Sequence, residues 1–142
     1  MGDLTKNFSR WEFGDPIEGT DYPDTYDVLA MARALEIVRW GLDTPLRVSS
    51  GWRSETYNRQ LRRLYPVGHP QRPARRTQHQ YGTAADIVPV RLEGVTLRER
   101  CTELGELILD GMRAGALPKG GVGIYVSWIH WDLRGRIVRW TK

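Results

Sequence analysis

The sequence predicts an α+β fold, in which about three helices pack on a small, mainly antiparallel sheet. Three stretches place apolar residues at helical spacing, and several short runs rich in Val and Ile lie between Gly and Pro residues. The chain has 142 residues, of which 40% are hydrophobic, enough for one core and too few for two ordinary ones. We therefore expect a single domain over residues 1–142.

The N-terminal part predicts irregular structure followed by a helix. The first 23 residues hold two aromatic-rich segments interrupted by Gly and Pro, typical of a short helical turn and a loop that wrap the domain. Apolar side chains then recur at helical spacing over residues 25–40. We expect Asp24 or Thr25 to cap this helix and Gly41 to end it.

The middle of the chain predicts a strand, a helix and a loop. Residues 46–50, LRVSS, have the composition of a short strand. Ser54 can cap a second helix, which ends at Pro66. One side of this helix carries the apolar residues Tyr57, Leu61 and Leu64. Residues 66–76 are rich in Pro and Arg and show no period, so we expect a mobile loop beside His79.

The C-terminal half predicts a third helix between strands. Residues 84–90 resemble a buried strand, and a capping box at residues 96–99 opens the helix. The core stripe expected for this helix is Leu97, Cys101, Leu104, Ile108 and Met112. Residues 122–134 and 137–140 are expected to form two strands joined tightly at Gly135.

Composition excludes several classes of protein. Lys and Arg number 21 against 17 Asp and Glu, so attraction to polyanions is permitted, but no nucleic-acid motif accompanies the charge and we expect no nucleic-acid partner. No stretch approaches the roughly 18 apolar residues of a membrane-spanning helix. Cys101 is the only cysteine, which rules out an intrachain disulfide and a zinc site closed by thiolates.

Three residues form a candidate metal site. His79 and Asp86 are seven residues apart, and His130 follows in W-I-H-W-D. Two imidazoles and one carboxylate can hold zinc and leave a fourth position open for water, the arrangement of hydrolytic zinc. Taken singly, each residue has a simpler interpretation: a loop histidine, a paired carboxylate and a strand histidine.

The neighbours of these residues strengthen the hypothesis. Gly82 interrupts the chain between His79 and the predicted strand, so a loop residue and a strand residue can approach one ion. Side chains two apart on a strand share a face, so Trp128, His130 and Asp132 are expected to point the same way. His130 and Asp132 can therefore serve one pocket.

Three ordered segments resemble a known family. S-G-W-R-S-E-T-Y-N at residues 50–58, T-Q-H-Q-Y-G-T-A-A-D-I at 77–87 and G-V-G-I-Y-V-S-W-I-H-W-D-L-R at 121–134 resemble the motif blocks of the zinc D-alanyl-D-alanine carboxypeptidase and murein endopeptidase family. That family shares its fold with the hedgehog signalling domain. The opening L-T-K-N-F-S-R-W-E-F is similar to the start of its short phage and prophage members.

The resemblance implies roles for individual residues. His79, Asp86 and His130 would hold one zinc ion, and Arg53 would grip a carboxylate of a peptide substrate, for which its planar guanidinium is suited. Substrate-binding candidates are Arg53, Tyr57, Asn58 and Trp128, although the helical Tyr57 and Asn58 could equally be packing and capping groups. The simpler interpretation of Trp40, Trp131 and Trp140 is that they are core or edge aromatics.

The proton acceptor departs from the family pattern. Many members place Glu or Asp three residues before the last histidine, where this chain has Ser127. Asp132 is the alternative, either as general base or as a residue that only orients a ligand histidine. Both roles stay open at this point.

The function that follows is a zinc metallopeptidase that cleaves peptidoglycan stem peptides or cross-links, of the D-Ala-D-Ala carboxypeptidase, L-Ala-D-Glu endopeptidase or cross-link endopeptidase type. Phage-type cell-wall lysis is the expected setting. The alternative is a catalytically impaired, zinc-containing module that binds the cell wall. We expect a monomer made in the cytoplasm without a signal peptide, which acts on the wall after release or as a phage component.

Overall fold

The computed structural model describes residues 2–22, 27–91 and 93–142 and confirms the α+β class. Its elements, in chain order, are η1 (Arg10–Phe13), α1 (Val28–Leu42), β1 (Leu46–Ser50), α2 (Glu55–Leu64), η2 (Gln78–Tyr81), β2 (Ala84–Pro89), α3 (Leu97–Arg113), β3 (Gly121–Ile124), β4 (Ile129–Asp132) and β5 (Val138–Thr141). None of the helices in these described ranges is long and apolar enough to cross a membrane.

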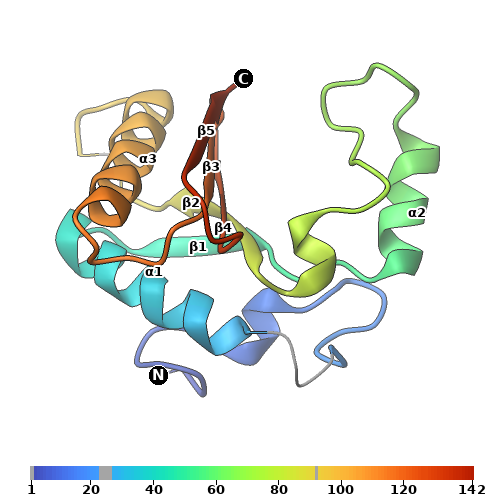
Figure 1. Ribbon diagram of the computed structural model, residues 1–142, viewed down its shortest axis with the longest axis horizontal. Helices are drawn as coiled ribbons and strands as arrows, with labels where there is room; N and C mark the ends of the chain where they lie inside the picture. Colours follow the sequence, from blue (N-terminus) through green and yellow to red (C-terminus); the bar gives the residue numbers. More distant parts are fainter. Residues whose placement is uncertain (1, 23–26, 92) are drawn as a thin grey trace.

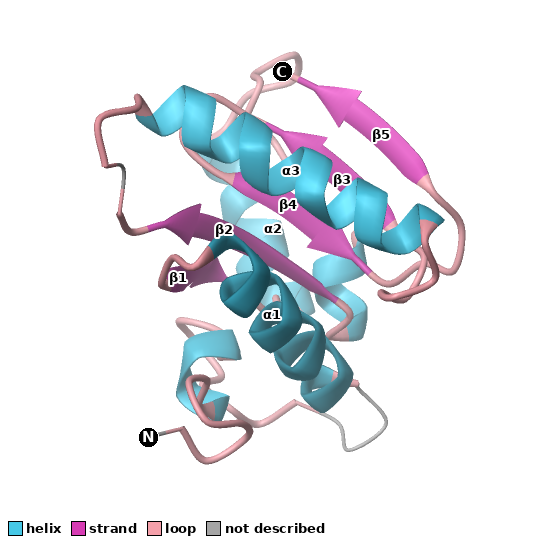
Figure 2. Ribbon diagram, turned by 90° about the vertical axis from the view of Figure 1, so that its left-hand side faces the viewer, coloured by secondary structure: helices cyan, strands magenta, loops and turns pink. Residues whose placement is uncertain are grey.

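A five-stranded sheet organises the molecule. Its strand order is β1-β2-β4-β3-β5, and every neighbouring pair is antiparallel except β3 and β5. The helices α1 and α3 cover one face of this sheet, whereas α2 and the loop after it stand apart from them (Figures 1 and 2). The opposite face is thus left to the segments that carry the candidate site.

Alternation along two central strands separates the core from the site. In β4, Ile129 and Trp131 are fully buried in the hydrophobic core, while His130 between them is only half-buried. In β2, Ala85 and Ile87 are likewise in the core and Asp86 is not. Because successive strand side chains point to opposite faces, His130 and Asp86 project from the face away from α1 and α3.

The helix boundaries follow from their caps. The expected caps of α1, Asp24 and Thr25, lie outside the described residues, and Asp27 accepts a hydrogen bond from the Ala30 amide at the start of the helix. The prediction that Gly41 ends α1 is wrong, because the helix continues to Leu42 and stops where Asp43 takes a left-handed conformation. The predicted caps of α2 and α3 are confirmed.

The helix α2 does not pack as its sequence predicts. Asn58 is its only buried residue, Leu61 is half-buried and Leu64 is 69% exposed. The apolar side that includes Tyr57 therefore faces no core. The loop at residues 66–76 is tied to α2 instead: Arg62 donates to the Pro73 carbonyl, and Asn58 donates to the carbonyls of Ala74 and Arg75.

The C-terminal strands also differ from the prediction. Residues 122–134 form two strands rather than one, because the chain reverses between Tyr125 and Trp128, where the Tyr125 amide donates to the Trp128 carbonyl over 3.0 Å. Gly135 turns the chain, yet β5 pairs in parallel with β3 and not with β4. Gly123 permits this arrangement, since a Cβ atom there would lie 2.5 Å from the Trp140 ring.

Candidate metal centre

Three elements bring the predicted ligands together. His79 lies in η2, Asp86 in β2 and His130 in β4, and the register of β2 with β4 sets Asp86 directly opposite His130. Gly82 ends η2 with φ of 67°, a left-handed conformation that turns the chain from His79 into β2. The prediction that Gly82 interrupts the chain between His79 and the strand is therefore confirmed.

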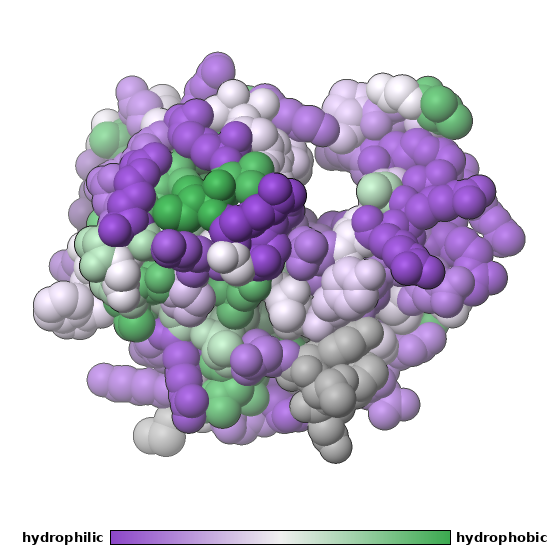
Figure 3. All heavy atoms as spheres, viewed as in Figure 1, coloured by the Kyte–Doolittle hydropathy of each residue, from purple (hydrophilic) through white to green (hydrophobic). Residues whose placement is uncertain are grey.

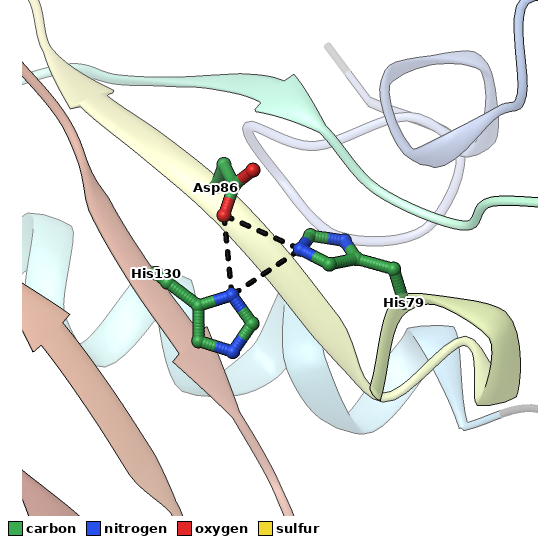
Figure 4. A group of neighbouring side chains, drawn as sticks. All are labelled: His79, Asp86 and His130. Atoms are coloured by element: carbon green, nitrogen blue, oxygen red, sulfur yellow. Dashed lines mark hydrogen bonds and ion pairs between the residues drawn. The ribbon is translucent and has the colours of Figure 1, made fainter. Parts of the chain in front are cut away.

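Three donor atoms converge in this group (Figure 4). His79 Nε2 lies 3.2 Å from His130 Nδ1 and 3.3 Å from Asp86 Oδ1, and His130 Nδ1 lies 3.2 Å from the same oxygen. The described residues contain no other cluster of three such side chains. One small cation could contact all three atoms.

The far side of each imidazole fixes which nitrogen offers its lone pair. His79 Nδ1 lies 2.7 Å from the Gly51 carbonyl, which can only accept, so this nitrogen carries the hydrogen and Nε2 is free to bind. His130 Nε2 lies 2.8 Å from Asp132 Oδ2, which leaves Nδ1 facing the cluster. A carbonyl or carboxylate behind a histidine is the usual support of a metal ligand.

Electrostatics at the cluster favours a bound cation. Burial lowers the pKa of His79 despite the nearby Asp86, so its imidazole is neutral. Burial opposes ionisation of Asp86, but the interactions with His79 and His130 outweigh it and hold the pKa of this carboxyl well below its usual range. Burial would lower the pKa of His130, but the interactions with Asp132 and Asp86 outweigh it and raise this pKa. Two nitrogens and a carboxylate oxygen are a donor set that zinc accepts, and metal binding must displace the proton that His130 then carries.

Asp132 sits behind His130, away from the other donors. It is fully buried, and its Oδ1 accepts from the Gly121 amide and from the Arg134 backbone amide and Nε. Its Oδ2 accepts from the second Arg134 guanidinium nitrogen at 2.7 Å, beside the contact with His130. Burial works against ionisation, yet His130 and Arg134 hold the pKa of Asp132 well below its usual range.

Arg53 lies beside the cluster. Its backbone amide donates to the His79 carbonyl over 3.0 Å, and its guanidinium donates to Asp86 Oδ2 over 3.3 Å. The Arg53 side chain remains 16% exposed and lines the hollow above the three donors. It can therefore orient Asp86 and still present donors to a bound molecule.

That hollow has a volume of about 570 Å³ and an aromatic wall. Trp128, predicted at the border of the site, stacks on Tyr125 with ring centroids 4.4 Å apart. Trp140 donates to the Tyr125 hydroxyl, and its ring centroid lies 5.3 Å from that of His130. Trp131 is a core residue as expected, but the interpretation of Trp140 as a core or edge aromatic missed its place at the site.

The two helical candidates lie at the margin. Tyr57 shares a neighbouring hollow with Arg53 and Trp128, whereas Asn58 is buried against the loop at residues 66–76 and does not line the hollow above the donors. Ser127 is exposed in the turn before β4. The structure thus brings Arg53 and Trp128 to the cluster and leaves Asn58 outside it.

Comparison with known proteins identifies the family. The sequence model of the family Peptidase M15 matches residues 11–132, from η1 to the last residue of β4. The chain belongs to the M15 peptidase family. No curated protein and no solved structure matches it. M15 peptidases are zinc-dependent, so this member is a metallopeptidase, and His79, Asp86 and His130 form its possible metal site.

Proposed function

We propose that this M15 peptidase uses one zinc ion to hydrolyse a peptide bond in the stem peptides or cross-links of bacterial peptidoglycan. The observation that supports it best is the convergence of His79 Nε2, His130 Nδ1 and Asp86 Oδ1, with both outer ring nitrogens held by acceptors. Zinc bound there would polarise a carbonyl group and lower the pKa of a water molecule towards 7.

The residues around the donors divide the remaining tasks. Arg53 offers a guanidinium at the edge of the hollow, where it can bind a carboxylate of the stem peptide while one nitrogen holds Asp86. Trp128 and Trp140 give the opposite side a flat, apolar wall for the substrate backbone. The hollow is open to solvent and can therefore admit an extended chain.

Asp132 has an orienting role in this proposal. Its two oxygens are occupied by Arg134, Gly121 and His130, and it does not line the hollow. A general base must reach the water that it deprotonates. We therefore assign Asp132 to fixing the ring of His130, and not to proton transfer from water.

One observation favours the alternative, a zinc-containing wall-binding module with impaired catalysis. Among the described acidic residues, Asp86 alone lines the hollow, and it belongs to the donor set. Ser127 stands where many relatives of this type carry a carboxylate. A module of this kind would bind the wall without releasing fragments.

Digestion of purified peptidoglycan distinguishes the two functions. Zinc-loaded protein is expected to release new amino termini, identified with the bond that is cut by mass spectrometry, and a chelator should abolish the release. Arg53→Lys keeps the charge but loses the planar fork, so its KM should rise by about tenfold or more. Binding to the wall without cleavage by the zinc-loaded protein would replace the peptidase with the binding module.

The biological setting is part of the same proposal. Similarity of the N-terminal segment to short phage members supports a role in phage-type lysis, with the enzyme reaching the wall after release from the cytoplasm or within a phage particle. A monomer suffices, because the three donors and Arg53 come from one chain.

A further inference from the structure

A second hollow, separate from the metal centre, lies between α2 and the loop at residues 66–76. Its volume is about 630 Å³. Six of the side chains that line it are arginines: Arg59, Arg62, Arg63, Arg72, Arg75 and Arg76. Of the described residues in this lining, only Glu55 is acidic, and it is already paired with Arg59 over 3.4 Å. We refer to this feature as the arginine hollow.

The positive charge of the protein is concentrated around this hollow. Residues 53–76 contain seven arginines and one glutamate, a net charge of +6, whereas the whole chain carries +4, so the remaining residues sum to −2. The surface over α2 and its loop is largely hydrophilic in the view of Figure 3. If the positive charge reflected only the overall composition, these arginines would be distributed over the whole sequence.

Two of the arginines build the hollow and three are available to a ligand. Arg72 donates to the carbonyls of Arg62 and Tyr65 at the end of α2, and Arg62 donates to the Pro73 carbonyl. Of the remaining four, Arg59 is paired with Glu55. No ion pair or side-chain hydrogen bond among the described residues satisfies the guanidinium groups of the last three, Arg63, Arg75 and Arg76. Within the described part of the chain, no acidic side chain pairs with these three charges.

This arrangement favours a bound anion. Partial burial lowers the pKa of Arg62, and the like charges of Arg72 and Arg75 lower it further. An anion in the hollow would relieve that repulsion and accept paired hydrogen bonds from planar guanidinium groups. The hollow would hold more than one carboxylate, so a chain with repeated negative groups fits it better than a single side chain or terminus.

We propose that the arginine hollow binds a phosphodiester-linked polymer of the bacterial cell wall. No aromatic residue is among the described residues that line it, so it lacks the stacking platform typical of single-stranded nucleic-acid sites. Arg72 and Arg76 line both this hollow and the one above the metal donors. A polymer held there would bring wall material to the centre; this wall assignment rests on the proposed function.

Binding measurements test the proposal without turnover. The probe is poly(glycerol phosphate), titrated against the zinc-loaded protein at low and at physiological salt. The variant Arg63→Gln/Arg75→Gln/Arg76→Gln is expected to bind about tenfold more weakly, with a shallower salt dependence. The matched control, Arg33→Gln/Arg98→Gln/Arg113→Gln on α1 and α3, loses the same charge and should keep its affinity. Thermal unfolding of both variants checks that they fold.

The outcomes separate the alternatives. Equal loss in both triple variants would show that net charge, and not the hollow, attracts the polymer. Equal affinity for poly-glutamate would overturn the preference for phosphate, and tighter binding of oligo-dT would overturn the assignment to a wall polymer. A protein that binds poly(glycerol phosphate) but cleaves no peptidoglycan would refute the peptidase and leave this inference standing.

Discussion

At the scale of single residues, the centre depends on which ring nitrogen of each histidine carries hydrogen. The Gly51 carbonyl sets this for His79, and Asp132 sets it for His130. Asp132 is itself fixed by Arg134, whose guanidinium pKa is raised by hydrogen bonding to that carboxylate. The orientation of the donor atom His130 Nδ1 thus depends on Arg134, which contacts His130 only through Asp132.

Asp132→Asn should weaken zinc binding by about 10- to 100-fold, because an amide can present its donor side to His130 and disturb the ring. Competition with a chromophoric chelator measures the affinity. Ser127→Ala, in the exposed turn before the same strand, is the control and should bind zinc as the wild type does. Unchanged zinc affinity together with lost peptidase activity would instead make Asp132 a general base.

At the scale of elements, α2 and its loop form an arm held mainly by polar contacts. Asn58 is 2% exposed and donates to the carbonyls of Ala74 and Arg75, although most of the helix around it is exposed. Apart from the stacked rings of Tyr65 and His69, the arm is held by hydrogen bonds such as these and those of Arg62 and Arg72, so its shape depends on them.

Asn58→Ala is expected to reduce the free energy of unfolding by about 1–2 kcal/mol, because two backbone carbonyls lose their donor. Urea denaturation gives this value, and hydrogen exchange should show faster opening of residues 66–76. Gln60→Ala, at an exposed position of the same helix, should change neither measurement. Equal exchange in both variants would show that the arm has another support.

The N-terminal segment is joined to α1 through Glu36. Its carboxylate accepts from the Thr5 hydroxyl, the Asn7 amide and the Asn7 side chain over 2.6–2.8 Å. Burial would raise the pKa of Glu36, but these hydrogen bonds outweigh it and the pKa is lowered. The stabilisation is therefore present above the unfolded pKa and is lost as pH falls through the lower folded value.

Glu36→Gln should cost about 1 kcal/mol of stability at pH 7. The difference from wild type should shrink below about pH 4, where the wild-type carboxylate also becomes protonated. Chemical denaturation at several pH values tests this, with the exposed Glu18→Gln as control. If the difference in unfolding free energy between wild type and Glu36→Gln did not change with pH, the charge of Glu36 would not be its cause.

At the scale of the whole molecule, the candidate metal centre brings together segments that are far apart in the sequence. His79 precedes β2, and His130 lies in β4, on the other side of α3 in the sequence. A ligand that binds only the folded arrangement stabilises it by mass action. Zinc should therefore stabilise the fold as well as serve the reaction.

Zinc at 100 times its dissociation constant is expected to add about 2.7 kcal/mol, or roughly 5–10 °C in Tm. Thermal unfolding with zinc and with chelator measures the shift. His130→Ala should unfold at the same temperature in both conditions, because it lacks one of the three donors. An unaltered Tm in the wild type would argue against zinc at this site.

The sequence predicted local structure and the convergence of His79, Asp86 and His130 better than it predicted strand partners. The capping box at residues 96–99 and Gly82 signal their structures within a few residues, and both are confirmed. The parallel pairing of β5 with β3 depends on Gly123 accommodating Trp140, a long-range contact that no local period reveals. For the same reason the local sequence did not predict that Trp140 lies beside His130.

The position of Asp132 shows a finer limit. Strand periodicity correctly predicted that Asp132 could reach His130, but not which ring nitrogen it would contact. That depends on the side-chain torsion of His130, which packing decides. The sequence therefore left open whether Asp132 is a general base or orients His130, and the geometry supports the orienting role that we propose.

The pairing of Asp86 opposite His130 also links strand alignment to metal binding. A shift of one residue between β2 and β4 would turn His130 towards the core and remove it from the donor set. Misaligned chains would consequently fail to capture zinc, while aligned chains would be held in place by it. Zinc bound at this site would thus favour the correct strand alignment, and we expect zinc content after refolding to report the fraction of correctly assembled molecules.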